Sequence, residues 1–397
     1  MITVGEAWRH IAHALPDYGS ESVAVEQCAG RVLRQPVDAE RDQPPFHRVM
    51  MDGIALCHTG ARRLRIGGTQ HAGDPPLAVA GDDCVEIMTG AVLPRGADTV
   101  VPFERIRVSD GHAELEAGYE PEPGQFIHRR GSDHGAGTRL LGSGTLLGAP
   151  EVAVLASQGL ARVEVGRRPA AAVVSTGNEL VPAGAAVAPH EIRLSNGPAV
   201  LASLLQHGHA GSRHLHLRDD PAVMRECLGA LLEQFPVLLL SGGVSKGKAD
   251  YVPGIMAELG VEVAFHRVSQ RPGKPMWFGT RGETLVFALP GNPVSALVCF
   301  RRYVLPALLR GAGSAPGAEE ETAVLGADHA FRPALTCFLP VRAARGADGS
   351  SVAMPAPTNT SGDFTALAGT TGFVELEAGR DRFAAGTAVP LHRWQLY

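Results

Sequence analysis

Aromatic residues are scarce in this sequence, where they make up 5% of 397 residues. Proteins that bind single-stranded nucleic acids stack the bases on aromatic rings, so this composition argues against such a surface. The net charge of −5 provides no general attraction for a polyanion either. Basic clusters such as His128-Arg129-Arg130 are short and isolated. We therefore expect no nucleic-acid partner, while a small anionic ligand is compatible with the composition.

Paired cysteines and long apolar runs are also missing. The 6 cysteines are scattered and none lies in a Cys-x-x-Cys pair, which argues against a zinc site and against a disulfide framework. The amino terminus lacks the basic start and the apolar block of a secretory signal. No uninterrupted apolar run approaches the roughly 18 residues that a membrane span needs. We expect a cytoplasmic protein with no membrane partner.

The length and composition predict a globular protein with several domains. A chain of 397 residues is too long for one compact core, and 45% apolar with 19% charged residues is typical of folded proteins. Amphipathic spacing predicts a helix over residues 4–15. Residues 38–136 contain short alternating strands separated by glycines, which predicts a β-rich domain. After about residue 314 the helical period disappears, which indicates a second β-domain.

Between these regions the pattern changes to alternating strands and helices. Apolar runs predict buried strands at residues 170–174 and 237–240, and further strands are predicted at 213–217, 261–268 and 284–289. Helices are predicted at 197–207, from Pro221 onward, at 251–259 and from Pro293 onward. Asp220 is the expected amino-terminal cap of the helix at Pro221. This alternation predicts an α/β domain with a mostly parallel sheet and helices on both faces.

Three polar, glycine-containing loops directly follow predicted strands, at residues 175–179, 241–251 and 289–295. Ligands of open parallel sheets bind outside the carboxyl ends of the strands. Glycine lets backbone N–H groups approach an anion, and the helix from Pro293 would present its first N–H groups. One such loop alone is more typical of a tight turn, but three on one sheet edge favour a phosphate-binding site. The expected contacts are Ser175, Thr176, Gly177, Glu179, Ser241, Gly242, Gly243, Ser245, Gly291 and Asn292.

Two cations lie in a stiff Arg-Pro-Gly-Lys-Pro segment at residues 271–275. A stiff backbone limits the entropy lost when Lys274 binds an oxyanion. A solvated turn is the alternative interpretation, but two prolines around a lysine favour a role in binding.

Carboxylates recur at the same predicted edge, at Glu179, Asp219 and Asp250. Carboxylates beside a phosphate site are typical of bound Mg²⁺. Alternatively, Asp219 shares helix capping with Asp220, and Asp250 caps the helix at 251–259. The cluster as a whole favours the metal.

Together these segments resemble the MoeA family of molybdopterin molybdenumtransferases, which includes the gephyrin E domain. The matching motifs keep the order of the family and cover nearly the whole chain. They are Pro-Phe with Met-Asp-Gly at 45–53, Ile-Met-Thr-Gly-Ala at 87–91, Arg-Arg-Gly-Ser-Asp at 129–133, Ser-Thr-Gly-Asn-Glu-Leu at 175–180, Arg-Asp-Asp-Pro at 218–221, Ser-Gly-Gly-Val-Ser with Ala-Asp-Tyr at 241–251, Pro-Gly-Lys-Pro at 272–275 and Leu-Pro-Gly-Asn-Pro-Val-Ser at 289–295.

The resemblance implies four domains and a homodimer. The domains would be a discontinuous amino-terminal domain (1–37 and 137–168), an inserted β-rich domain (38–136), a molybdopterin-binding α/β domain (169–314) and a carboxyl-terminal β-barrel (315–397). The active cleft would lie between the binding domain of one subunit and the inserted domain of its partner. The implied reaction uses adenylyl-molybdopterin and molybdate, requires Mg²⁺ and releases AMP. Hand-over of ligand to or from a molybdopterin adenylyltransferase or a molybdoenzyme is a further expectation.

The resemblance also assigns roles to single residues. Glu179, Asp219 and Asp250 would serve Mg²⁺. The oxyanion and ligand site would be lined by Lys274, Arg271, Pro290 and Pro293, with Ser361 from the terminal domain. Thr89 and Asp133 would act from the inserted domain.

Several positions depart from the family pattern. His47 stands where the family has a carboxylate associated with catalysis, and Pro340 stands where it has an arginine. Ser132 and Lys248 replace glutamates before Asp133 and Asp250, and Arg193-Leu194-Ser195-Asn196 replaces Tyr-Asp-Thr-Asn. His47 can still accept a proton, or donate one when charged. Two alternatives to the transferase follow: a divergent paralogue that binds or carries molybdopterin without inserting metal, and an enzyme that modifies molybdopterin differently.

Overall fold

The computed structural model describes residues 1–243, 251–315 and 321–395. The chain divides into two compact units. Unit 1 consists of residues 1–35, 143–152 and 161–397, and unit 2 consists of residues 36–142 and 153–160. The division into four domains stays a prediction.

The core of unit 1 is a six-stranded sheet in the order β16-β13-β17-β21-β20-β18. Its strands are β16 (Arg213–Leu217), β13 (Ala171–Thr176), β17 (Val237–Ser241), β21 (Thr284–Leu289), β20 (Trp277–Arg281) and β18 (Glu262–His266). The first four run parallel, which confirms the predicted mostly parallel sheet. The strand predicted at 261–268 is the exception. It is β18, which pairs antiparallel with β20, a strand that the sequence analysis did not predict.

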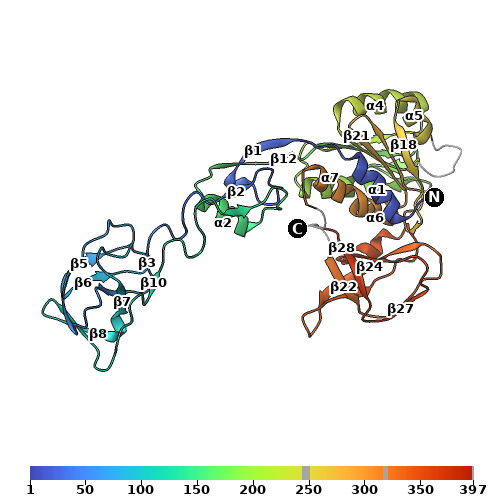
Figure 1. Cartoon of the computed structure of the whole chain (residues 1–397). Coiled ribbons are helices and arrows are strands. Elements are labelled where there is room, and N and C mark those ends of the chain that lie inside the picture. Colours follow the sequence, from blue (N-terminus) through green and yellow to red (C-terminus); the bar gives the residue numbers. More distant parts are fainter. Residues whose placement is uncertain (244–250, 316–320, 396–397) are drawn as a thin grey trace. The chain divides into compact units, whose positions relative to one another are not determined.

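Helices cover both faces of this sheet because successive residues of its buried strands point to opposite sides. Val173 and Leu239 pack with α1, α3, α6 and α7, whereas Val174 and Leu240 pack with α4 and α5. Figure 1 shows α4 and α5 on the opposite side of the sheet from α1, α6 and α7. The helices are α1 (Val4–Ala14), α3 (Asn196–Gln206), α4 (Pro221–Gln234), α5 (Val252–Glu258), α6 (Pro293–Cys299) and α7 (Leu305–Gly311).

The ends of two helices follow directly from the sequence. The side chain of Asp220 accepts hydrogen bonds from the N–H groups of Ala222 and Val223, so the predicted cap of α4 is confirmed. Thr3 and Glu6 form a capping box at the start of α1, which satisfies donors that the first turn of a helix leaves unpaired.

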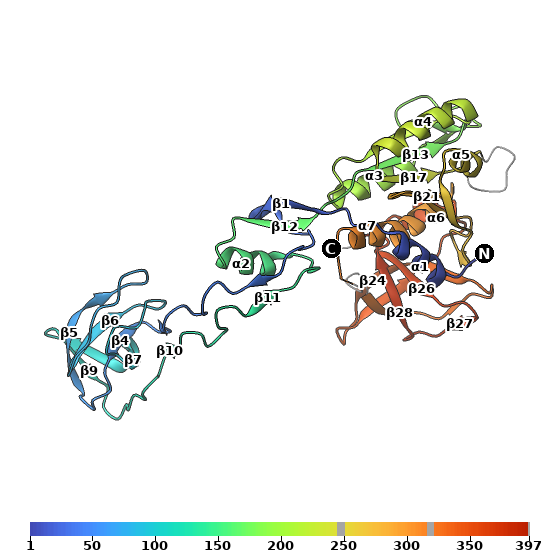
Figure 2. The ribbon, with the colours of Figure 1, turned by 45° about the horizontal axis from the view of Figure 1, so that its top comes forward.

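The carboxyl-terminal part of unit 1 is a closed five-stranded barrel. Its strands are β22 (Glu321–Leu325), β24 (Thr336–Arg345), β25 (Ser351–Pro355), β26 (Gly372–Leu376) and β28 (Ala388–Arg393). Pairing of β24 with β26 closes the barrel, and a short strand β19 (Gln270–Arg271) adds to β24. Figure 2 shows this group of strands in orange and red. The barrel confirms the predicted terminal β-domain.

Unit 2 contains a six-stranded sheet in the order β7-β4-β6-β5-β9-β8. The strands are β7 (Thr99–Pro102), β4 (Gly53–Leu56), β6 (Asp83–Ile87), β5 (Arg63–Gln70), β9 (His112–Leu115) and β8 (Ile106–Ser109). A second, short pair consists of β3 (Arg48–Val49) and β10 (Ile127–His128). The predicted β-rich character of this region is confirmed. None of the helices within the described residues is long and apolar enough to cross a membrane.

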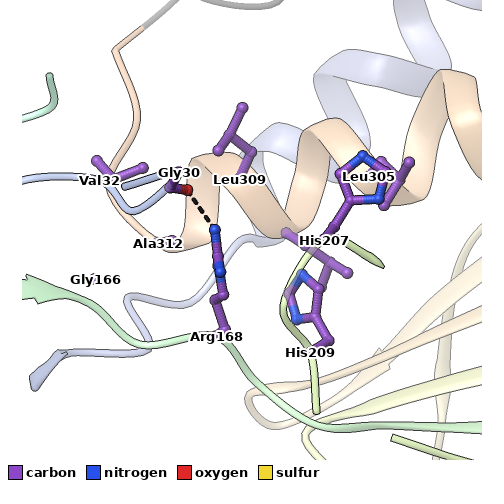
Figure 3. Close-up of a pocket in the computed structure, with 10 residues that line it drawn as sticks. Gly30, Val32, Gly166, Arg168, His207, His209, Leu305, Leu309 and Ala312 are labelled. Carbon is purple, nitrogen blue, oxygen red and sulfur yellow. Dashed lines mark hydrogen bonds between the residues drawn. The ribbon is translucent and has the colours of Figure 1, made fainter. Parts of the chain in front are cut away.

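A small internal cavity of about 20 Å³ lies beneath α7, and two histidines and an arginine line it (Figure 3). Arg168 donates a hydrogen bond to the carbonyl oxygen of Gly30, and Nδ1 of His209 donates to that of Pro169 at 2.8 Å. Burial lowers the pKa of His209 to about 4, and the nearby charge of Arg168 acts in the same direction. The folded protein therefore holds this imidazole in its neutral form.

This buried histidine makes stability depend on pH. An unfolded histidine has a pKa of about 6.5, so the unfolded chain binds a proton first as the pH falls. The free energy of unfolding should therefore drop by about 3 kcal/mol between pH 6.5 and pH 4 because of His209. The amide of His209→Asn can still donate to the carbonyl oxygen of Pro169. In this variant the free energy of unfolding, measured in urea, should fall by about 3 kcal/mol less over the same pH range. A variant of the exposed His190, His190→Asn, should lose stability as the wild type does. Parallel curves for wild type and His209→Asn would contradict this explanation.

Candidate functional site

The three polar loops named from the sequence meet at one edge of the α/β sheet. Strands β13, β17 and β21 are parallel neighbours, and their register places Ser175 beside Ser241 and Ser241 beside Leu289. The residues that follow line one cleft of about 1320 Å³ within unit 1. Of the expected loop contacts, the cleft is lined by Ser175, Thr176, Gly177, Glu179, Ser241, Gly242, Gly243, Pro290, Gly291, Asn292 and Pro293. Ser245 lies outside the described residues.

Asn196, the first residue of α3, ties two of these loops together. Its Nδ2 donates to the Oγ of Ser241 at 2.9 Å and to the carbonyl oxygen of Gly291 at 2.7 Å. A side-chain amide has two donor hydrogens, and both are used here. Sequence reasoning noted Asn196 only as part of a divergent motif. The sequence contains one signal for this role: Asn196 directly precedes the helix predicted at 197–207, which follows the first loop.

The second loop passes very close to the first, which explains its glycines. Gly242 and Gly243 have φ of 102° and 69°, a region that L-residues rarely adopt. A Cβ atom on Gly242 would lie 2.7 Å from the carbonyl oxygen of Thr176. The hydroxyl of Thr176 is buried at this contact and has no hydrogen-bond partner among the described residues. The loop thus needs glycine for backbone conformation and for space.

Two carboxylates lie at the same end of the cleft. Glu179 and Asp219 both line it. The N–H of Asn178 donates to Asp219 at 3.3 Å, and the N–H of Asp219 donates to Asn178 Oδ1 at 3.2 Å, which joins the two loops. The cap residue of α4 is Asp220, whose side chain accepts from the N–H groups of Ala222 and Val223. Asp250 lies outside the described residues.

These carboxylates suit a hard divalent cation. Mg²⁺ is usually held by one or two carboxylates together with substrate phosphates and waters, and Glu179 and Asp219 offer such oxygen ligands. Within the described ranges no group of three or more histidine, cysteine, aspartate or glutamate side chains could hold a metal by itself. The arrangement fits a cation that binds together with a phosphate ligand.

The stiff segment at residues 271–275 forms another wall of the cleft. Strand β19 pairs with β24 of the barrel, which fixes the start of this segment. Arg271 and Lys274 are both exposed, line the cleft and make no ion pair with any described residue. Cations without a protein counter-ion in a cleft are available to an anionic ligand.

Ser361, from the barrel region, forms hydrogen bonds with residues at the start of α6. Nδ2 of Asn292 donates to the Oγ of Ser361 at 2.7 Å, and the N–H of Val294 donates to the carbonyl oxygen of Ser361 at 3.1 Å. Pro293 has no N–H, so the α6 terminus offers fewer donors to an anion than the sequence pattern suggested. Ser361 itself lines the cleft, as the resemblance implied.

Sequence reasoning missed much of the wall that the barrel region provides. The missed lining residues are His329, Phe331, Leu335, Cys337, Leu339, Thr358, Asn359, Thr360 and Phe364. No motif marks them, because they come from strand ends and turns that are distant in sequence. Pro340 and Arg193, two departures from the family pattern, also line the cleft. Pro340 brings no charge where the family has an arginine.

The remaining predicted site residues, His47, Thr89 and Asp133, lie in unit 2. Oδ1 of Asp52 accepts hydrogen bonds from the N–H and the hydroxyl of Thr89, both at 2.6 Å. These two hydrogen bonds lower the pKa of Asp52. These hydrogen bonds join the turn at residues 51–53 to the turn at residues 88–91.

The segments that carry His47 and Asp133 are also joined. Nδ1 of His47 accepts a hydrogen bond from the N–H of Arg130 at 3.2 Å. Arg130 in turn donates to Asp42 at 2.8 Å. Oδ1 of Asp133 pairs with Nε2 of His128 at 2.8 Å.

Comparison with known proteins agrees with this geometry. Three family models match the chain: the MoeA N-terminal region (domain I and II) over residues 2–159, a probable molybdopterin binding domain over 172–310 and the MoeA C-terminal region (domain IV) over 322–394. The chain belongs to the MoeA family. A molybdopterin molybdenumtransferase of a Synechocystis species is 39% identical over 402 residues, which cover 99% of this chain and 100% of the relative.

Two further relatives extend the likeness. A molybdopterin molybdenumtransferase of Bacillus subtilis is 31% identical over 404 residues, covering 98% of this chain and 93% of the relative. The crystal structure of a molybdopterin biosynthesis MoeA protein from Pyrococcus horikosii superimposes with a TM-score of 0.79 at 29% identity, covering 100% and 99% of the two chains. The fold predicted from the motifs is confirmed.

The close approach of the loops can be tested at Gly242. Gly242→Ala should lower the free energy of unfolding by about 2 kcal/mol, because the added Cβ meets the Thr176 carbonyl and the backbone conformation is strained. Gly254→Ala in α5 is the matched control, since a Cβ there meets nothing within 4 Å. The control should be neutral or up to about 1 kcal/mol more stable, as glycine disfavours helices. Equal effects of both substitutions in denaturant unfolding would contradict the crowding.

Proposed function

We propose that this protein is a molybdopterin molybdenumtransferase that acts in the biosynthesis of the molybdenum cofactor. Its substrates would be adenylyl-molybdopterin and molybdate, and its products the molybdenum cofactor and AMP. The observation that carries the proposal is the cleft, in which three strand ends, two carboxylates and two cations without an ion pair among the described residues converge. Such a lining suits a ligand with several phosphates and a second oxyanion beside it.

The phosphates of the adenylyl-molybdopterin would bind at the loops after β13, β17 and β21. Backbone N–H groups can approach an anion there because Gly242 and Gly243 carry no side chain. The two hydrogen bonds of Asn196 keep the second and third loops at a fixed separation before the ligand arrives. Binding then requires little reordering of the protein, which favours affinity.

Molybdate, a dianion, would bind at Lys274 and Arg271, with Ser361 as a further donor. Both cations are held on one stiff segment, and Arg271 belongs to a strand that pairs with the barrel. Charge-assisted hydrogen bonds of this kind contribute about 1.5–3 kcal/mol each. Because Pro340 stands where the family has an arginine, the binding of molybdate would depend more strongly on Lys274 and Arg271.

Glu179 and Asp219, with Asp250 as a third candidate, would hold Mg²⁺ at the phosphates. Bound there, the ion would neutralise charge that develops on the phosphate oxygens when AMP leaves. The reciprocal hydrogen bonds of Asn178 and Asp219 would orient the carboxylates for this role. Removal of Mg²⁺ should therefore abolish AMP release.

The inserted domain would supply His47, Thr89 and Asp133 from the partner subunit of a homodimer. The support is the resemblance of the three segments to the family motifs, together with the hydrogen bonds that join them. Nδ1 of His47 accepts a backbone N–H, so its Nε2 carries the proton of the neutral ring and can donate to a ligand oxyanion.

The proposed reaction can be tested with purified protein, adenylyl-molybdopterin, molybdate and Mg²⁺. We expect release of AMP and formation of a cofactor that activates a molybdenum-free molybdoenzyme. Chelation by EDTA should stop both, and added Mg²⁺ should restore them. Tight binding of molybdopterin without AMP release under these conditions would exclude the transferase.

Lys274→Gln tests the molybdate site. The KM for molybdate should rise about 10- to 100-fold because one charge-assisted contact is lost. Arg213→Gln is the matched control. Arg213 is an exposed cation at the amino-terminal end of β16, and it does not line the cleft. An unchanged KM for molybdate in Lys274→Gln would place the oxyanion elsewhere.

A second candidate function is a paralogue that binds or carries molybdopterin or the finished cofactor without inserting metal. The exchange of a family carboxylate for His47 and of a family arginine for Pro340 favours it. His47→Ala and His47→Asp distinguish the two functions. Loss of AMP release in His47→Ala supports the transferase with a working histidine. An inactive wild type that gains AMP release in His47→Asp supports the carrier.

A further inference from the structure

A carboxylate, an imidazole and a guanidinium form a chain of hydrogen bonds in unit 2. Oδ1 of Asp133 lies 2.8 Å from Nε2 of His128, and Nδ1 of the same ring lies 3.0 Å from Nη2 of Arg48. None of the motifs that carry the family resemblance assigns a role to His128 or Arg48. We call these three residues the Arg48–His128–Asp133 chain.

The arginine fixes the protonation state of the histidine. A guanidinium has only donor hydrogens, so Nδ1 of His128 must be the acceptor in its contact with Arg48. The ring then carries its single proton on Nε2, which donates to Asp133. A second proton on Nδ1 would point at the cation and lose this hydrogen bond. Within these contacts Nδ1 of His128 is an acceptor, and Oδ1 of Asp133 accepts from Nε2.

Backbone pairing places the three side chains. Strands β3 and β10 are antiparallel, and His128 is the direct cross-strand partner of Arg48. The N–H of Asp133 donates to the carbonyl oxygen of Gln43 at 2.9 Å, which holds the turn after β10 against the segment before β3. The contact is set by register and needs no ligand to form.

Within the Arg48–His128–Asp133 chain, the side chain of Asp133 is more exposed than that of His128. The side chain of His128 is 26% exposed and that of Asp133 is 46% exposed. Oδ2 of Asp133 has no hydrogen-bond partner among the described residues. One carboxylate oxygen is thus anchored by the protein, and the other remains available to a ligand.

The surrounding charges are balanced. Three segments meet here, at residues 42–52, 88–92 and 127–134, and they are joined by β3–β10 pairing and by the hydrogen bond of the Val49 N–H to Ala91. Their titratable and charged groups are Asp42, His47, Arg48, Asp52, His128, Arg129, Arg130, Asp133 and His134. Asp42 already pairs with Arg130, and Asp52 with Thr89. Arg48 is the cation whose contact with His128 is direct.

We propose that His128 and Arg48 are positioning residues for the proposed reaction, which orient the side chain of Asp133. This inference rests on the role of Asp133 in the proposed function. His128 acts through Asp133, and Arg48 acts through His128. The chain makes Asp133 an anion or proton acceptor toward the substrate rather than a proton donor.

Steady-state insertion assays on the full-length protein test the positioning. His128→Leu should lower kcat about 10- to 100-fold with little change in KM, since a misplaced reacting group costs about this much. His128→Gln, whose amide can still donate to Asp133, should recover most of the rate. Arg107→Leu, which removes an exposed arginine on β8 in the six-stranded sheet of unit 2, should behave as wild type. Equal loss in the leucine and glutamine variants, or none in either, would overturn the positioning role.

The arginine is tested by kcat. In Arg48→Leu the Nδ1 of His128 loses the donor that orients the ring. This variant should lower kcat about 10-fold with little change in KM, and Arg48→Lys, which can still donate to Nδ1, should recover most of the rate. Equal loss in both variants, or none in either, would overturn the role of Arg48.

A spectroscopic test needs no enzyme activity. Long-range proton–nitrogen NMR spectra of the ¹⁵N-histidine-labelled full-length protein distinguish ring nitrogens with and without a proton, and the His128→Gln spectrum identifies the signals of His128. We expect an unprotonated Nδ1 and a protonated Nε2 at neutral pH. A doubly protonated ring, or a proton on Nδ1, would refute the chain. If the spectrum is as expected but Asp133→Asn retains full activity, the proposed role of Asp133 fails, and the positioning role with it, while the hydrogen-bond chain itself stands.

Discussion

The site depends above all on the parallel register of three buried strands. Because β13, β17 and β21 end level with one another, loops that are more than a hundred residues apart in sequence share one edge. Side-chain amides then fix the separation of these loops: Asn196 bridges the second and third, and Asn178 bridges the first to the turn before α4. The close approach of Gly242 to Thr176 is possible only at this spacing. A shift of one strand would misplace all of these contacts together.

Much of this arrangement could be predicted from the sequence. Runs such as Val237–Leu240 are apolar at every position because their strands are buried on both faces, and Asp220-Pro221 marks a helix start with its cap. Other features depend on partners distant in sequence, which local patterns do not encode. Strand β20, the two-loop bridge of Asn196 and the lining from Phe331 to Phe364 belong to this group. Cross-strand register likewise decides that Arg48 meets His128.

The departures from the family pattern are distributed unevenly over the molecule. The three loops of the α/β edge keep the glycines of the family motifs, the two cations at 271–275 and the carboxylates Glu179 and Asp219. The changes fall on His47 and Ser132 in unit 2, on Arg193, Leu194 and Ser195 before α3, on Lys248 in the second loop and on Pro340 in the barrel. His47 is nevertheless held by a backbone N–H, and its neighbour Arg48 is engaged with His128. Polar side chains near His47 differ from the family pattern, but those that are present are joined by hydrogen bonds.

The contact of Ser361 with the start of α6 has a consequence for how the domains could be separated. The Val294 N–H donates to the carbonyl oxygen of Ser361, which belongs to the barrel region. A fragment that ended after α7 would leave this amide open to solvent and would lose the hydroxyl that Asn292 holds. Such a fragment would also lack the part of the cleft wall that residues 329–364 provide. The barrel region thus completes a cleft whose loops follow the strands of the α/β sheet, so the two parts have to be studied together.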